Sequence, residues 1–166
     1  MSMFDLFQGL PIHALVVHAA VVLLPLSAIA TAAVTVFSRW RPLLQWWLGI
    51  DAVMLVLAFV AKESGEKLQA RLSQAEGHQV AEDHAEMGDL IPLVALALLI
   101  AAAIAYWLIG RLAVTDEVPP ARRLIAVGLV TVVALGTVGW TVAVGHSGAD
   151  AVWRDQVTSG PSSPAS

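Results

Sequence analysis

Four long apolar runs, separated by short polar segments, make up most of the chain. They cover residues 6–38, 42–61, 90–110 and 124–145, and within them Asp51 is the only Asp, Glu, Lys or Arg. The hydrocarbon core of a bilayer is about 30 Å thick, and a helix crosses it with about 20 apolar residues. Because backbone groups find no water in that core, each run is predicted to be a membrane-spanning helix.

These runs predict an all-α fold: an integral membrane four-helix bundle that forms one domain over residues 1–153. The first run follows no basic segment and exceeds the roughly 7–15 apolar residues of a signal peptide, so we expect it to be retained. The polar tail 154–166 is expected to be disordered. The expected spans are about 11–38, 42–62, 89–110 and 122–145, with an outer polar loop at 63–88.

Small residues within the spans are candidates for helix contacts, because helices in membranes pack closely where side chains are small. In the first span these are Ala28, Ala32 and Ala33. In the fourth span we expect Gly128, Gly136 and Gly139 to have this role.

Composition agrees with a membrane protein and excludes several other classes. Of the 166 residues, 58% are hydrophobic and 13% charged, whereas soluble domains average about 45–50% and about 25%. These values exclude a disordered chain, a basic nucleic-acid binder and an ordinary soluble enzyme. The chain has no Cys, which excludes disulfides, zinc–thiolate sites and iron–sulfur ligation within it.

The charged residues divide unequally between the two sides of the predicted bundle. One side carries Arg39, Arg41, Arg111, Arg122 and Arg123 with only Asp116 and Glu117. The other side carries most of the acids, so the arginine-rich side is expected to be cytoplasmic and both termini extracytoplasmic. Trp residues at both ends of the spans are expected to mark the membrane interfaces.

All the histidines are predicted on the outer, acidic side: His13, His18, His78, His84 and His146. His13 and His18 are separated by about 140° around a helix, so they do not share one face. A site must therefore be assembled between helices. His18 lies about 7.5 Å deeper than His13, and an ionisable group at such depth is expected to face the bundle interior. It is either a ligand or proton-relay group, or a neutral side chain bonded to a carbonyl or hydroxyl.

Carboxylates on the same side complete a candidate ligand set. Asp150 follows His146 by four residues and is placed to hold the second imidazole nitrogen. Glu63, Glu66 and Glu86 offer further oxygen ligands, or simply form a solvated face. Imidazole with carboxylate suits zinc, copper or iron, whereas two imidazoles from facing helices suit haem b.

Asp51 is the one charged position inside a span, and the first span has hydroxyls at similar depth. Ser27 and Thr31, with Thr35, form a stripe at i, i+4 and i+8. We predict that Asp51 accepts hydrogen bonds from this stripe or is protonated, since an unpaired ion there is costly. The contact acts either as a hydrogen bond between helices or in proton conduction.

Four segments resemble the bacterial four-span membrane family catalogued as domain of unknown function 2231. They are LPIHALVVH at 10–18, SGE at 64–66, HAEMGD at 84–89 and GHSGADAVW at 145–153. The resemblance implies a bacterial inner-membrane location and places His13, His18, His84 and His146 at motif positions, whereas His78 matches none. Ala14 stands where many members have Pro. Some relatives are fused to Rieske-type domains, which favours a redox role.

Three functional classes follow from these features. The first is a redox or electron-transfer protein that holds haem b or a transition metal at His18, His84 and His146, with Gly136 and Gly139 leaving room for a porphyrin. The second is a metal-handling or sensing protein. The third is an accessory subunit of a membrane complex. The chain lacks a Gly-x-Ser-x-Gly elbow, a P-loop and a Rossmann fingerprint, so we do not expect it to be an enzyme on its own.

Overall fold

The computed structural model describes residues 6–7, 10–72, 86–112 and 117–158, with side chains placed at 15–67, 86–112 and 117–149. A two-residue antiparallel pair, β1 (Leu6–Phe7) and β2 (Leu10–Pro11), precedes the helices. The long helices are α1 (Ile12–Val36), α2 (Leu44–Leu72), α4 (Ile91–Ala105) and α5 (Pro120–Thr158). A 3₁₀ turn η1 (Ser38–Leu43) joins α1 to α2, and a π-helical turn η2 (Tyr106–Gly110) continues α4.

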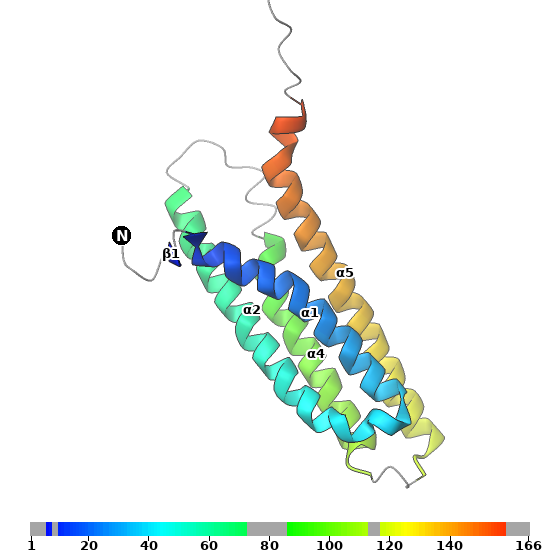
Figure 1. The fold of residues 1–166 in the computed structure, drawn as a ribbon. Helices are drawn as coiled ribbons and strands as arrows, with labels where there is room; N and C mark the ends of the chain where they lie inside the picture. The colour runs from blue at the N-terminus through cyan, green and yellow to red at the C-terminus, as the bar shows by residue number, and fades with distance from the viewer. Residues whose placement is uncertain (1–5, 8–9, 73–85, 113–116, 159–166) are drawn as a thin grey trace, which may run out of the picture.

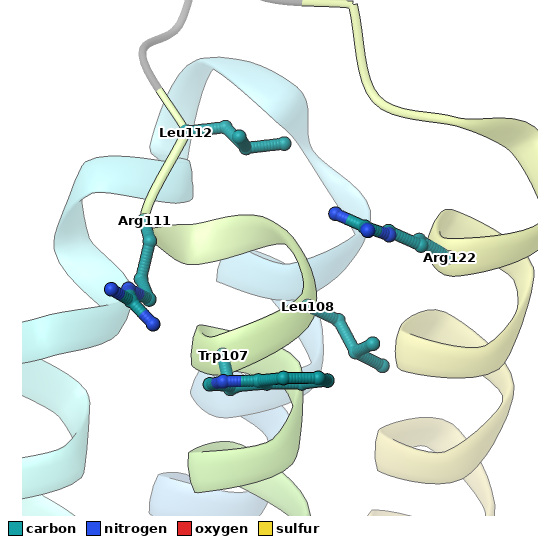
Figure 2. A pocket seen from close by; sticks show the side chains of 5 residues that line it. All are labelled: Trp107, Leu108, Arg111, Leu112 and Arg122. Carbon is teal, nitrogen blue, oxygen red and sulfur yellow. The ribbon is translucent and has the colours of Figure 1, made fainter.

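The four helices pack side by side as a bundle (Figure 1). Helix α1 packs on α2 and α5, and α4 packs on the same two helices, so α1 and α4 lie on one diagonal. We call the end where α1 begins and α5 ends the histidine end, because it carries His18 and His146. We call the opposite end, with η1 and η2, the arginine end. Figure 2 shows part of it, with Arg111 after η2 and Arg122 in the first turn of α5.

The bundle agrees with the predicted all-α class, and two helices are longer than their expected spans. Helix α2 runs to Leu72, into the segment expected to be a loop from residue 63. Helix α5 has 39 residues, which at about 1.5 Å per residue is about 58 Å. A bilayer core is about 30 Å thick, so a large part of α5 extends beyond it. The short β1–β2 pair was not expected.

The outer surface of the bundle is apolar, unlike that of a soluble protein. Large apolar side chains point outward, among them Val56 and Leu93, each 62% exposed, and Val132, 71% exposed. The interior is mostly apolar as well, and it also holds polar side chains that are 5% exposed or less: Ser27, Thr31, Thr35, Arg41, Asp51, Thr137 and Thr141. A soluble bundle buries its apolar stripe and exposes its polar face. Four helices are long and apolar enough to cross a membrane, and their outer surface suits lipid.

Alanines, and not the three glycines expected in the fourth span, make close helix contacts. Ala28 is fully buried, as expected, and Ala32 packs against both apolar clusters of the core. Gly128, Gly136 and Gly139 are exposed, and a Cβ added at any of them would meet nothing within 4 Å. The predicted contact role of these glycines is wrong, because they lie on the outward face of α5. For the same reason Gly136 and Gly139 cannot make room for a porphyrin inside the bundle.

Gly110, at the end of η2, is the glycine that packs most tightly among those described. A Cβ there would lie 2.6 Å from Tyr106 Cδ2 and 3.2 Å from Leu44 Cδ1. The absence of a side chain therefore lets the end of α4 approach the start of α2.

The same substitution at two glycines tests this packing. We expect Gly110→Ala to lower the free energy of unfolding by about 1–3 kcal/mol, because the new methyl group overlaps Tyr106 and Leu44. Gly136→Ala, the matched control, has open space and should leave stability unchanged or slightly increased. Thermal unfolding of the detergent-solubilised chain measures both. Equal losses for the two variants would contradict the packing described.

Candidate functional site

Asp51 is held by two hydroxyls of the neighbouring helix. Ser27 Oγ donates to Asp51 Oδ1 at 2.5 Å, and Thr31 Oγ1 donates to Asp51 Oδ2 at 2.9 Å. Ser27 and Thr31 are four residues apart and so lie on one face of α1, toward α2. The hydrogen bonds expected from this stripe are present for these two residues. Thr35 differs, because its hydroxyl donates instead to the carbonyl of Thr31 at 2.7 Å.

This polar contact lies between two apolar layers of the core. Along α2, Asp51 is placed between Leu44 and Ala58, which belong to different apolar clusters. On α5, Thr137 and Thr141 donate to the carbonyls of Val133 and Thr137, at 2.9 and 2.7 Å. Each of these buried hydroxyls is thus satisfied locally, as the interior of a membrane bundle requires.

At the histidine end, His18 and His146 lie on two helices that touch. A Cβ at Gly145 would lie 3.5 Å from Val21 Cγ1, so α1 and α5 are in contact here. His18 precedes Val21 by three residues, or about 4.5 Å along the helix axis, and His146 directly follows Gly145. The fold therefore brings these two imidazoles to the same end and to neighbouring helices.

Both side chains are exposed. The expectation that His18 faces the bundle interior is wrong, because its position on α1 falls in line with Val22 and Leu26, which are 56% and 55% exposed. His146 likewise follows the outward face of α5 that includes Gly139 and Val142.

Other predicted ligands are only partly described. The side chains of His13 and Asp150 lie outside the described residues, as do all of His78 and His84. Glu63, Glu66 and Glu86 are placed and exposed. Within the described ranges, no three His, Cys, Asp or Glu side chains form a group able to hold a metal ion.

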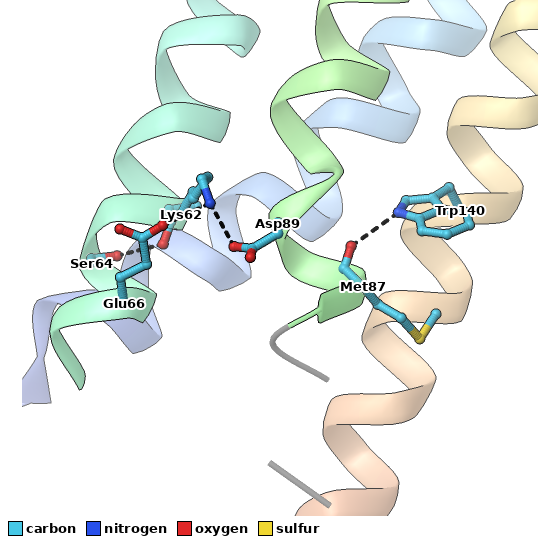
Figure 3. A network of polar contacts seen from close by, with 7 residues as sticks. Lys62, Ser64, Glu66, Met87, Asp89 and Trp140 are labelled. Atoms are coloured by element: carbon cyan, nitrogen blue, oxygen red, sulfur yellow. Dashed lines mark hydrogen bonds and ion pairs between the residues drawn. The ribbon is translucent and has the colours of Figure 1, made fainter. Parts of the chain in front are cut away.

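A network of polar contacts connects three helices at the histidine end (Figure 3). Lys62 Nζ lies 2.7 Å from both Glu66 Oε1 and Asp89 Oδ1, and so joins α2 to the segment that enters α4. Trp140 Nε1 of α5 donates to the carbonyl of Met87 at 3.2 Å. The Lys62–Glu66 spacing of i, i+4 is visible in the sequence, but the pairing of Lys62 with Asp89 joins distant segments and has no local signal.

Removing the Asp51 carboxylate tests its part in holding α1 to α2. Asp51→Leu leaves two buried hydroxyls without their acceptor, so we expect the free energy of unfolding to fall by about 1–3 kcal/mol. Asp51→Asn keeps a carbonyl oxygen and should lose less. Glu63→Leu, which removes an exposed acid from the same helix, is the control. Unfolding by sodium dodecyl sulfate, followed by circular dichroism, gives the midpoints; an unchanged midpoint for Asp51→Leu would contradict this role.

Comparison with known proteins gives one match. No curated protein and no solved structure matches the chain. A family model described as "Predicted membrane protein (DUF2231)" matches residues 9–161, a range that contains all four long helices. The resemblance recognised from the motifs is thereby confirmed. With four long apolar helices in one bundle and this match over nearly its whole length, the chain belongs to the DUF2231 family of predicted membrane proteins.

Proposed function

We propose that the histidine end binds haem b or a transition metal and serves in electron transfer. The observation that carries this proposal is the contact of Val21 with Gly145, which places His18 and His146 on touching helices. His84 lies outside the described residues, and it joins these two histidines through its motif position in the sequence. His18, His84 and His146 also occupy motif positions of the family, so the family resemblance favours the same three ligands.

The chemistry of the donors fits such a group. Neutral imidazole binds haem iron, zinc, copper and non-haem iron. His18 and His146 are both exposed, so such a group would bind at the surface of the bundle. Bound iron or copper would supply one-electron chemistry, while the helices α1 and α5 would hold and orient the imidazoles.

We further propose that the histidine end is extracytoplasmic and that the membrane is the bacterial inner membrane. The support is the concentration of arginines at the opposite end, where Arg39, Arg41, Arg111, Arg122 and Arg123 are found. Such an excess of basic residues is typical of cytoplasmic loops.

A second function, an accessory subunit of a membrane complex, is favoured by the length of α5. Helix α5 has 39 residues and is about 58 Å long, whereas a bilayer core is about 30 Å thick. A helix that projects from the membrane presents a surface to a partner. This function requires no cofactor, so the experiment below separates it from the first.

The first function is tested on the full chain purified in a mild detergent. We expect either a Soret band in the visible spectrum or one bound transition metal by elemental analysis. His18→Ala and His146→Ala should each lower occupancy by about 10–100-fold, as loss of a ligand or its support does. His78→Ala, which removes a histidine outside the motifs, is the matched control and should keep full occupancy.

Two results would contradict this function. One is a protein with neither a Soret band nor a bound metal after growth with added haem precursor and trace metals. The other is occupancy that stays the same in the His18 and His146 variants.

A further inference from the structure

A pocket opens at the arginine end, between the last turns of α4 with η2 and the first turn of α5. Its volume is about 330 Å³, which is within the range of small-molecule sites, roughly 300–1,000 Å³. Figure 2 shows Arg122 reaching from α5 toward η2, Arg111 just after η2, and Trp107 and Leu108 deeper on η2. The lining residues are Trp107, Leu108, Arg111, Leu112 and Arg122.

The two arginines of the pocket carry charge that the described chain does not neutralise. Both side chains are exposed, and no acidic side chain placed by the structure pairs with either guanidinium. Other arginines at this end are engaged. Arg123 donates to the carbonyl of Val36 at 3.4 Å, and the Arg39 guanidinium lies 4.9 Å from the centre of the Trp40 ring.

The pocket lies at the ends of two candidate membrane spans. The candidate span of α4 ends at Gly110, next to Arg111, and that of α5 begins at Pro120, close to Arg122. Trp107 lies one turn further into the span and is 66% exposed. Trp is enriched at this depth of a membrane, where its ring meets both lipid chains and water.

We propose that this pocket binds the phosphate headgroup of an anionic phospholipid. Guanidinium groups form charge-assisted, often bidentate, hydrogen bonds with phosphate oxygens. Trp107 and Leu108 supply an apolar wall for the upper part of the acyl chains. Basic pockets between membrane helices bind anionic headgroups in this way. The proposal is independent of any cofactor at the histidine end.

Native mass spectrometry of the full, detergent-solubilised chain tests the site. Phosphatidylglycerol and phosphatidylcholine with identical acyl chains are titrated separately, so that only headgroup charge differs. We expect phosphatidylglycerol to bind about 30-fold more tightly, since each of the two basic residues near a membrane surface contributes about 1 kcal/mol, or about fivefold. The double variant Arg111→Gln/Arg122→Gln should lose this preference, and Arg111→Lys/Arg122→Lys should keep most of it.

Arg39→Gln is the matched control, because Arg39 is at the same end but does not line the pocket. It should retain the preference. Circular dichroism establishes that each variant is folded; if the double variant does not fold, the single Gln variants should each lower the preference about fivefold.

Three results would overturn the proposal. Equal binding of the two lipids would show that charge is not recognised. A loss with Arg39→Gln as large as with the double variant would show diffuse attraction to the arginine end. Displacement of phosphatidylglycerol by soluble glycerol phosphate at equal concentration would show a site for free phosphate compounds instead of a lipid.

Discussion

The hydrocarbon core of a bilayer offers no hydrogen-bond partner, and this constraint decides where each polar group of the spans lies. Asp51 meets it through hydroxyls of another helix, Ser27 and Thr31. Thr137 and Thr141 meet it through carbonyls of their own helix. Unlike the two threonine contacts, the Asp51 contact is between helices, so it orients α1 on α2 as well as satisfying the carboxyl group. The remaining packing is made by apolar and small side chains.

The same constraint gives the molecule two polar ends and, between them, helices whose outer surface is apolar. The histidine end combines exposed imidazoles with the Lys62–Asp89 and Trp140–Met87 contacts, which fix the entry to α4 against α2 and α5. The arginine end combines cationic side chains with Trp107 around an open pocket. Chemistry that involves charged or polar ligands is therefore confined to the ends. The two proposals concern opposite ends and do not depend on one another.

The number of spans and the Asp51 contact could be predicted because both depend on local features: the length of apolar runs, and hydroxyls at i and i+4. Which face of each helix points inward could not be predicted. A span that is apolar on all sides gives no signal for which side is inside. For this reason the sequence places His18 and Gly136 in the interior, although both are exposed. The pairing of Lys62 with Asp89 depends on how α2 and α4 meet, which the local sequence does not encode. The family could be recognised from short motifs, but these motifs do not identify a cofactor.

Cysteine labelling tests most directly whether the two ends lie on opposite sides of a membrane, with the histidine end outside. The chain has no Cys, so single-cysteine variants need no background substitutions. Ala149→Cys reports on the histidine end and Ser38→Cys on the arginine end, and both positions are exposed. With a membrane-impermeant maleimide, we expect labelling of Ala149→Cys in intact cells with a permeabilised outer membrane, and of Ser38→Cys only after the inner membrane is opened. Labelling of both positions from the same side, or the reverse order, would contradict this arrangement.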